Sequence, residues 1–357
     1  MSNEVKIGMV GVGRWGSNVL RAMSGVDRVD LRWICDVDQV ALAKQSRPHP
    51  AAKTTTRMEE VLADPDVDAV AIATPAEAHC TCVRAALDAG KHVFVEKPLT
   101  LRSDDARDLV ALAQQRGLKL MVGHVFVHHP VVEYLKSAIE GGELGDVYYA
   151  YSQRLNLGVI RRHENAWWSL APHDVSIVCH LFDSVPHSVA LNGRCFVQDG
   201  VEDVVFGTLY FGDGRMANVH ASWLDPCKIR KVTVVGSRKM AVYDDMNAPE
   251  RLRIYDKGAD TQRSGLSYAD YVQLRSGDIL IPQIPQTEPL SQECRRFVEA
   301  VCDDAPIITD GRNGLAVVQI LEAGMESLRR NGVPVRIGEI EPRSAIPQFA
   351  PGELVTV

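Results

Sequence analysis

The sequence predicts an α/β protein with two domains, in which a parallel sheet alternating with helices precedes an open, largely antiparallel sheet. Three observations support this prediction. The chain has 357 residues, and domains usually contain about 100–200. Short apolar runs alternate with helical patterns up to Gly123, which is typical of βαβ units. From Asp146 onward, longer segments alternate polar and apolar residues, which is typical of antiparallel strands.

The first predicted domain spans residues 1–123 and is built from buried strands and the helices between them. The strands are expected at 5–10, 29–35, 67–73, 91–95 and 118–122. The helices are expected at 16–23, 38–43, 76–89 and 103–117. Gly90 is well placed to end the third of these helices, and Ser103 is the expected N-cap of the fourth.

The second predicted domain spans residues 124–357. Its strands are expected at 147–155, 188–197, 204–211, 215–223, 228–235 and 239–243. Its helices are expected at 172–182, 290–302 and 312–331, and residues 257–288 read as a long surface loop.

Composition excludes several classes of protein. Hydrophobic residues make up 46% of the chain, which is enough to build cores and argues against disorder. The formal net charge of -7 argues against nonspecific nucleic-acid binding. No apolar run reaches the roughly 18–20 residues of a membrane span, and no signal peptide is recognisable. We therefore expect a cytoplasmic chain with neither a nucleic-acid nor a membrane partner.

Cysteines and histidines give no metal or disulfide pattern. The eight cysteines are scattered without a CxxC pair, so we expect them to be mostly small core residues. His128 and His129 are adjacent, and adjacent residues on a helix do not share a face. His173 and His180 could share one, but no metal is expected.

A glycine fingerprint follows the first strand. Gly11, Gly13 and Gly16 form a GxGxxG that opens a helix, with Arg14 and Trp15 inside it. Such glycines permit a tight turn, close approach of a pyrophosphate and close helix packing, which predicts a Rossmann dinucleotide site. Asp36, at the end of the second strand, suits the ribose hydroxyls and favours NAD. Arg32 and Arg47 leave NADP open as the less favoured cofactor.

Three further motifs indicate a resemblance to a known family. Glu96-Lys97-Pro98-Leu99 follows the fourth strand, Ala73-Thr74-Pro75 with His79 follows the third, and His173 lies on a later helix. With these motifs the chain resembles the glucose-fructose oxidoreductase / inositol dehydrogenase / rhizopine-catabolism (Gfo/Idh/MocA) family from residue 5 to about 331. The resemblance implies NAD(P)-dependent oxidation or reduction of a sugar or cyclitol carbon, and a homodimer or homotetramer formed through the second sheet. The cofactor contacts that it implies are Arg14, Trp15, Thr74, Pro75, His79, Glu96 and Lys97.

Within that family the chain is most similar to UDP-sugar 3-dehydrogenases such as the UDP-N-acetylglucosaminuronate enzymes. The similarity rests on residues 156–158, 165–174, 223–230 and 235–237. It implies oxidation of the 3-hydroxyl of a UDP-linked hexose to a 3-keto sugar that feeds amino-sugar biosynthesis. The expected substrate residues combine cations for a diphosphate or uronate, an indole for stacking, and polar ligands. They are Asn165, Trp168, Asp174, Lys228 and Arg230.

Two residues are expected to carry the chemistry. Lys97 follows a strand at the edge of the sheet where ligands bind, and its ammonium would polarise the hydroxyl. His173 would act as the general base, because an imidazole exchanges protons near neutral pH. Glu96 would orient Lys97. Many family members carry Asp one helical turn before this histidine, and here Ser169 stands there, so a simple Asp–His relay is not expected.

Two other functions stay open on the sequence. The chain would instead be an inositol, free-sugar or aminoglycoside-sugar dehydrogenase if its substrate lacks a nucleotide. It would be an NAD-sensing regulator if it performs no chemistry, although Lys97 and His173 argue against this.

Overall fold

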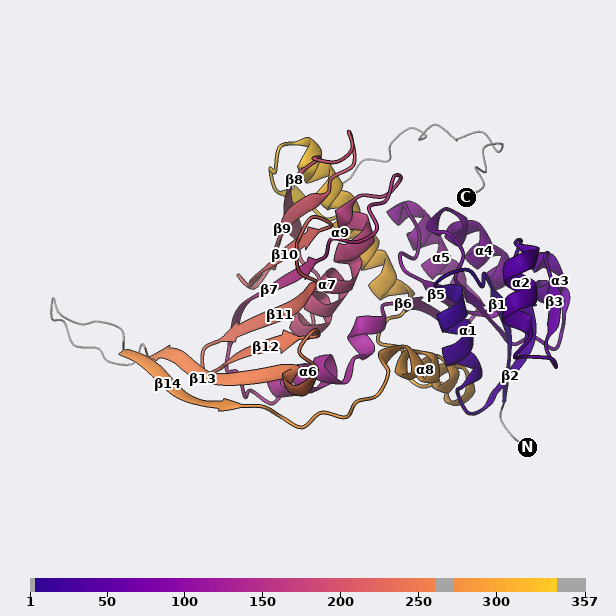
Figure 1. The fold of residues 1–357 in the computed structure, drawn as a ribbon, viewed down its shortest axis with the longest axis horizontal. Helices are drawn as coiled ribbons and strands as arrows, with labels where there is room; N and C mark the ends of the chain where they lie inside the picture. Colours follow the sequence, from indigo (N-terminus) through magenta and orange to yellow (C-terminus); the bar gives the residue numbers. More distant parts are fainter. Residues whose placement is uncertain (1–3, 261–272, 339–357) are drawn as a thin grey trace.

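The computed structural model describes residues 4–260 and 273–338 and contains two sheets with helices around them (Figure 1). The first sheet is parallel, with six strands in the order β3-β2-β1-β4-β5-β6. Its strands are β1 (Val5–Val10), β2 (Val29–Cys35), β3 (Lys53–Thr55), β4 (Ala69–Ile72), β5 (His92–Glu96) and β6 (Leu120–Gly123). This order is that of a Rossmann domain, so the predicted fold is confirmed.

Helices connect the parallel strands. They are α1 (Gly16–Ser24), α2 (Gln39–Ser46), α3 (Met58–Ala63), α4 (Ala76–Asp88) and α5 (Ser103–Gln115). Gly90 adopts φ +74° just after α4, as predicted for a helix end. The prediction for Ser103 is wrong, because Arg102 occupies the N-cap position of α5 without a side-chain hydrogen bond. β3 and α3 were not predicted, since such short elements leave too little periodicity to recognise.

The second sheet has nine strands in the order β14-β13-β12-β11-β7-β10-β9-β8-β15. All pairs are antiparallel except β7 with β10, which confirms the predicted open, largely antiparallel sheet. Its strands are β7 (Val147–Leu155), β8 (Ser188–Arg194), β9 (Val204–Tyr210), β10 (Met216–Ser222), β11 (Ile229–Gly236), β12 (Met240–Asp244), β13 (Leu252–Asp260), β14 (Gln273–Leu280) and β15 (Val335–Arg336).

The hairpin of β13 and β14 corrects the predicted loop at 257–288. The two strands pair from Ile254 opposite Leu280 to Asp260 opposite Gln273, and residues 261–272 lie outside the described part of the chain. β14 is an edge strand whose described side chains are nearly all exposed. Without a buried face it shows no alternation of apolar and polar residues, so its sequence does not resemble a strand.

Helices of the second half lie mainly between the two sheets (Figure 1). They are η1 (Val125–His128), α6 (Pro130–Glu140), α7 (Ala166–Phe182), η2 (Ala248–Glu250), α8 (Pro289–Asp303) and α9 (Gly311–Arg329). α7 begins at Ala166 rather than at residue 172, so Pro172 lies inside the helix. The predicted helix, which began at this proline, therefore starts too late.

Trp167 fixes α7 in the hydrophobic core that packs against the second sheet. Trp167 is fully buried and donates from Nε1 to the carbonyl of Leu321 in α9 at 3.1 Å. A Cβ added at Gly207 or Gly324 would come within 2.9 Å or 2.6 Å of the indole, so both positions need glycine. This packing sets the position of the whole helix, including His173.

The chain returns to the first sheet after completing the second. Phe297 of α8 packs edge-on against Phe94 of β5, with ring centroids 5.8 Å apart, in the core of the parallel sheet. Residues of α8 thus belong to the hydrophobic core of the parallel sheet although they lie far beyond Gly123 in the sequence. The division of the chain into two domains at Gly123 stays a prediction. Within the described parts of the chain, every helix is too short or too polar to cross a membrane.

Candidate active site

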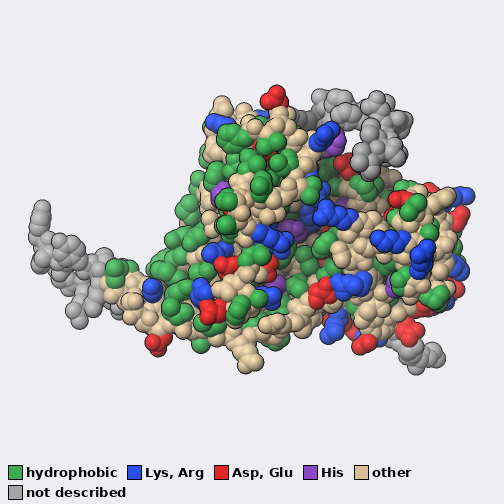
Figure 2. Space-filling model, in the orientation of Figure 1, with side chains coloured by type: hydrophobic (Ala, Val, Ile, Leu, Met, Phe, Trp, Pro, Cys, Tyr) green, Lys and Arg blue, Asp and Glu red, His purple; other side chains and the backbone are tan. Residues whose placement is uncertain are grey.

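A cavity of about 1720 Å³ lies between the two sheets. On one side it is lined by residues that follow β1, β4 and β5, the carboxyl ends of parallel strands, where ligands of such sheets bind. On the other side it is lined by β7, the 156–165 segment, α7 and the start of β11. Lys, Arg and His side chains gather along the hollow between the two halves (Figure 2).

The glycine turn forms an open cradle. Gly11 has φ +87°, and a Cβ there would come within 2.8 Å of the Ala73 backbone. A Cβ on Gly16 would collide with the carbonyl of Gly11, so α1 starts against the turn. At Gly13, by contrast, no described atom lies within 4 Å of an added Cβ. The backbone is thus bare beside the N-terminus of α1, as an anionic pyrophosphate requires.

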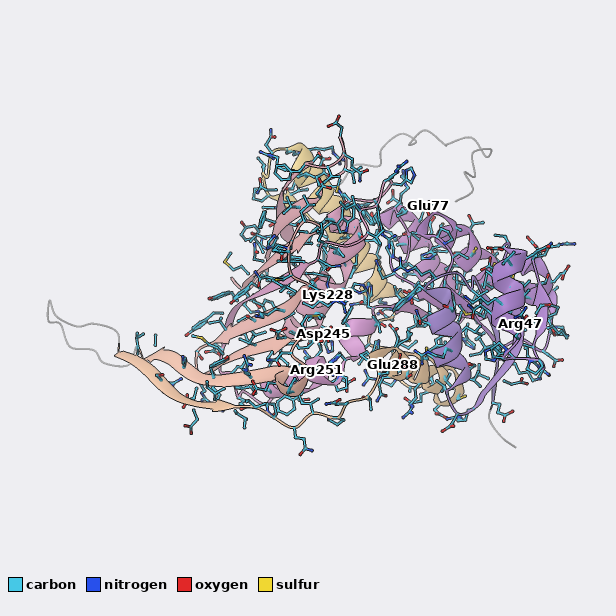
Figure 3. All side chains as sticks on the ribbon, in the orientation of Figure 1. Arg47, Glu77, Lys228, Asp245, Arg251 and Glu288 are labelled. Carbon is cyan, nitrogen blue, oxygen red and sulfur yellow. The ribbon has the colours of Figure 1, made fainter. Side chains whose placement is uncertain are left out.

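Asp36 is held at the end of β2 beside this turn. Its Oδ2 accepts from the Val12 amide at 2.6 Å and its Oδ1 from the Asp38 amide at 2.9 Å. Asp38, and not Asp36, caps α2, at 2.8 and 3.2 Å. A carboxylate can accept further hydrogen bonds, so Asp36 remains suited to ribose hydroxyls. Arg47 lies on the outer side of the parallel-sheet half (Figure 3).

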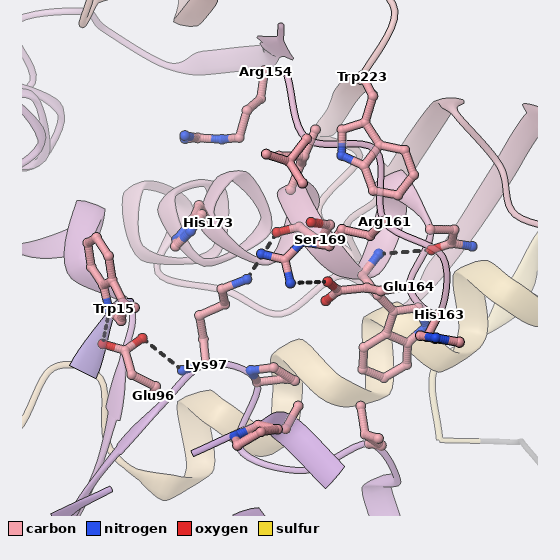
Figure 4. Close-up of a pocket in the computed structure, with 18 of the residues that line it drawn as sticks. Trp15, Glu96, Lys97, Arg154, Arg161, His163, Glu164, Ser169, His173 and Trp223 are labelled. Carbon is pink, nitrogen blue, oxygen red and sulfur yellow. Dashed lines mark hydrogen bonds and ion pairs between the residues drawn. The ribbon is translucent and has the colours of Figure 1, made fainter. Parts of the chain in front are cut away.

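Glu96 joins the glycine turn to the candidate catalytic lysine. Its Oε1 accepts from Nε1 of Trp15 at 2.6 Å, and its Oε2 accepts from the Lys97 amide at 3.3 Å (Figure 4). Burial raises the pKa of Glu96 to about 7. The Trp15 indole itself is 47% exposed at the cradle. Together with Gly13 and Asp36, these groups fit a bound dinucleotide.

Lys97 reaches from the end of β5 to α7. Its Nζ donates to the carbonyl of Ser169 at 3.0 Å (Figure 4). Burial lowers the pKa of Lys97, while the carboxylates of Glu164 and Glu96 act in the opposite direction. An ammonium has three donors, and Ser169 is its one hydrogen-bond partner among the described residues. Two donors therefore remain for a substrate oxygen.

His173 lies one helical turn after Ser169, on the same side of α7. Its ring meets Phe126 edge-on, with centroids 4.9 Å apart, and its Nδ1 is buried without a partner among the described residues. Burial, followed by the nearby Lys97 charge, lowers the pKa of His173 well below 6.5. The imidazole is therefore neutral near neutral pH and able to accept a proton.

His79 is tied to the backbone of two loops. Its Nδ1 lies 2.7 Å from the carbonyl of Pro98, and its Nε2 lies 3.0 Å from the carbonyl of Thr74. The side chain is 1% exposed. Both ring nitrogens are thus engaged within the protein, and His79 fixes the loop after β4 against the loop after β5. Thr74 and Pro75 line the cavity, as does Arg14 from the glycine turn.

Two predicted substrate residues have hydrogen-bond partners within the protein. Asn165 is the N-cap of α7: its Oδ1 accepts from the Trp168 amide at 3.1 Å, and its Nδ2 contacts Glu202 at 2.7 Å and Met325 at 3.2 Å. Asn165 also lines the cavity, so its contact with a substrate stays a prediction. Asp174 is 1% exposed and absent from the cavity wall, because it faces the inner side of β7.

The partner of Asp174 is a residue that sequence reasoning missed. Arg154 of β7 donates from Nε and Nη2 to Asp174, at 2.5 and 3.3 Å, and also lines the cavity. The sequence contained one indication of this role: Arg154 falls at the same alternate positions of β7 as Ala150 and Ser152, whose side chains are buried. Like Asn165, three further predicted substrate residues line the cavity: Trp168, Lys228 and Arg230. Figure 3 shows Lys228 on the side of the second sheet that faces the first.

Family models match both halves of the chain. Residues 5–124 match the oxidoreductase family with an NAD-binding Rossmann fold, and residues 132–242 match the GFO/IDH/MocA C-terminal domain.

Individual relatives cover nearly the whole chain. UDP-N-acetylglucosamine 3-dehydrogenase of Acidithiobacillus ferrooxidans is 26% identical over 88% of this chain and 94% of its own length. Its solved structure superposes with a TM-score of 0.79 at 24% identity, covering 92% and 99% of the two chains. GenD2 from gentamicin A biosynthesis, solved with NAD, has 25% identity and a TM-score of 0.76 over 93% and 96%. Inositol 2-dehydrogenase of Rhizobium meliloti is 23% identical over 91% and 97%.

Proposed function

The chain belongs to the GFO/IDH/MocA oxidoreductase family, and from that premise we propose that it oxidises the 3-hydroxyl of a UDP-linked hexose with NAD. The family makes it an NAD-binding oxidoreductase. The observation that carries the proposed reaction is that two groups line the same cavity: the Lys97 ammonium, with two unused donors, and the neutral imidazole of His173. Both line the cavity that opens onto the glycine cradle.

The two side chains divide the work of alcohol oxidation. Bound NAD supplies the acceptor for the hydride that leaves carbon 3. Lys97 donates hydrogen bonds to the hydroxyl oxygen and stabilises the negative charge that develops there. His173 accepts the hydroxyl proton, because its lowered pKa leaves the ring unprotonated. The C–H and O–H bonds break, a C=O bond forms, and the proton remains on the imidazole until solvent removes it.

Trp15 and Glu96 would keep this arrangement aligned with the cofactor. Their hydrogen bond at 2.6 Å joins the turn that would hold the pyrophosphate to the residue that precedes Lys97. A shift of the turn would therefore be transmitted to the lysine backbone through one short side-chain contact. Orientation of this kind contributes to rate by holding the reacting groups in place.

The cavity also supports a nucleotide-linked sugar. Its volume of about 1720 Å³ exceeds the roughly 300–1,000 Å³ of an ordinary ligand pocket, so it has room for a dinucleotide together with a second large ligand. Arg162 and Lys228 line it, are exposed, and have no ion-pair partner among the described residues. Such cations suit a diphosphate. The relative that acts on UDP-N-acetylglucosamine agrees with this proposal.

The outer face of the second sheet supports assembly as a homodimer or homotetramer. Tyr149 and Tyr151 of β7 are 41% and 38% exposed, and Phe206 of β9, on the other side of β10, is 48% exposed. Tyr149 stacks with Tyr151, and Phe206 stacks on His220 at a centroid distance of 4.2 Å. A contiguous aromatic surface of this kind is typical of an interface. Sedimentation analysis of the wild type should give a dimer or tetramer, and a monomer at all concentrations would contradict this.

A substrate screen tests the reaction. Purified protein with NAD is offered UDP-glucose, UDP-N-acetylglucosamine and its uronate, alongside myo-inositol, glucose and an aminoglycoside, and NADH formation is followed by absorbance. We expect turnover with UDP-linked sugars. Preference for inositol or a free sugar would favour the alternative dehydrogenase, and binding of NAD without any turnover would favour a regulator.

A further inference from the structure

The proposed base has no hydrogen-bond partner on its buried side among the described residues. His173 lines the cavity and its buried nitrogen is Nδ1, so Nε2 is the nitrogen that meets a substrate. An imidazole accepts a proton at Nε2 only when Nδ1 carries the ring hydrogen, and an acceptor bonded to Nδ1 fixes this tautomer. Position 169, one helical turn earlier, is a serine. Asp174, the next residue, is bonded to Arg154.

His124 is a second buried imidazole beside this site. It follows β6 and precedes η1, which packs against α7. The residue is fully buried, and both ring nitrogens are without a hydrogen-bond partner in the described parts of the chain. Burial and the Lys97 charge lower the pKa of His124 to about 3, so the ring is neutral and offers one donor and one acceptor. Buried polar groups are normally hydrogen-bonded, because an unpaired one destabilises the fold.

The groups around His173 differ in the hydrogen bonds that they can make. Burial lowers the pKa of His173, and charges on four residues act in the same direction: Lys97, Arg154, His124 and Arg230. An ammonium or a guanidinium donates hydrogen bonds but has no acceptor atom. Phe126, two residues after His124, meets the His173 ring edge-on at 4.9 Å and is apolar. Of these neighbours, only His124 has a side-chain atom that can accept from the Nδ1–H of the base.

We propose that His124 is a positioning residue that accepts a hydrogen bond from Nδ1 of His173, directly or through one water, and thereby leaves Nε2 free to take the hydroxyl proton. Nδ1 keeps its own hydrogen throughout the reaction. A neutral acceptor fixes the tautomer without adding a negative charge, so the base retains its lowered pKa. The inference rests on the proposed function, in which His173 is the base, and adds a residue that does not line the cavity.

Substitutions in this segment test the role. His124→Leu removes the acceptor and should reduce kcat with a UDP-sugar roughly 10–100-fold, because an unpaired buried donor favours the other tautomer, with KM changed by less than about 3-fold. His124→Gln keeps an acceptor oxygen and should retain kcat within about 5-fold of the wild type. His128→Leu is the matched control, since this buried imidazole lies 3.1 Å from Thr309 and 3.0 Å from Arg296 and does not line the cavity. It should lower the melting temperature and keep kcat within about 3-fold.

A carboxylate introduced on α7 should repair the loss. In His124→Leu combined with Ser169→Asp, the new side chain lies one helical turn before His173 and can accept from Nδ1. We expect kcat to recover by about 10-fold or more relative to His124→Leu alone. The acid limb of kcat/KM should lie at higher pH than in the wild type, because a nearby negative charge raises the pKa of an imidazole. A purely structural defect at position 124 would not be repaired by a charge on another element.

Nuclear magnetic resonance measures the tautomer without any substrate. In protein labelled with nitrogen-15 in its histidine rings, the signals of His173 are assigned by their loss in His173→Gln. They should show the hydrogen on Nδ1 in the wild type and a shift toward Nε2–H in His124→Leu.

Several results would overturn the inference and leave the proposed function standing. They are a wild-type His173 with its hydrogen on Nε2, a His124→Leu kcat within about 3-fold of the wild type, or equal losses in His124→Leu and His124→Gln. A wild type that turns over none of the sugars would overturn the proposed function, and with it the catalytic role of His124, even if the Nδ1–H tautomer were observed.

Discussion

Replacing Lys97 with methionine separates chemistry from cofactor binding. The ammonium has a single described partner, the Ser169 carbonyl at 3.0 Å, and burial lowers its pKa. Methionine keeps most of the side-chain length and removes the charge. The loss of one charged donor to a developing oxyanion costs about 3–4 kcal/mol, which corresponds to a decrease in kcat of roughly 10²–10³-fold. Stability should hold or rise, because a desolvated cation has been removed.

The assay pairs steady-state NADH formation with a titration of NAD that follows the intrinsic tryptophan fluorescence, to which Trp15 at the cradle contributes. For Lys97→Met we expect the large loss in kcat with NAD affinity within about 3-fold of the wild type. Lys91→Met is the matched control, since this buried lysine at the other end of the strand donates to the carbonyls of Asp64 and Val67 at 2.9 and 2.7 Å. It should lower the melting temperature and spare kcat. A kcat for Lys97→Met within 10-fold of the wild type would refute the reasoning.

Four further predictions follow from the geometry. Gly13→Ala should weaken NAD by at least about 10-fold with an unchanged melting temperature, whereas Gly16→Ala, whose Cβ meets backbone, should also unfold more easily; equal effects on stability would contradict this. The acid limb of kcat/KM should lie below pH 6.5, because the pKa of His173 is lowered and the ring stays a base there; a limb above 6.5 would contradict this. Burial raises the Glu96 pKa from 4.5 to about 7, so the stability that protonated Glu96 contributes is complete below pH 4.5 and is lost as pH rises to 7. In chemical denaturation, the free energy of unfolding of Glu96→Gln relative to the wild type should therefore increase over this pH range by up to about 3 kcal/mol. A difference that does not change with pH would argue against this. Gly324→Ala should cost about 1–3 kcal/mol of unfolding free energy in denaturant titrations because its Cβ would lie 2.6 Å from an indole nitrogen, and a neutral effect would mean that α7 can shift freely.

Local motifs made the first half of the molecule predictable. The positions of Gly11, Gly13 and Gly16 are dictated by turn geometry and close backbone approach, which sequence spacing records directly. Lys97 follows a strand at the ligand-binding edge of a parallel sheet, but it could be proposed as catalytic only with the family resemblance, because position alone favours an ordinary surface lysine. The glycine inference needs only a few consecutive residues and the order of the elements.

Residues whose roles depend on distant partners could not be assigned in this way. Asp174 looked like a substrate ligand beside His173, but it pairs with Arg154, twenty positions earlier on another element. Asn165 was proposed as a sugar ligand from the family resemblance; it caps α7 and contacts Glu202, and it also lines the cavity. In both cases a partner from a distant part of the sequence holds the side chain, and residue type alone does not reveal that partner.

The position of hydride transfer tests the central claim most directly. The nucleotide-linked sugar that the enzyme oxidises is prepared with deuterium at carbon 3 and mixed with enzyme and NAD, and the NADH formed is analysed by mass spectrometry. The account predicts that the deuterium appears in the reduced cofactor and is absent from the keto sugar. Unlabelled NADH together with a sugar product that retains deuterium at carbon 3 would contradict it.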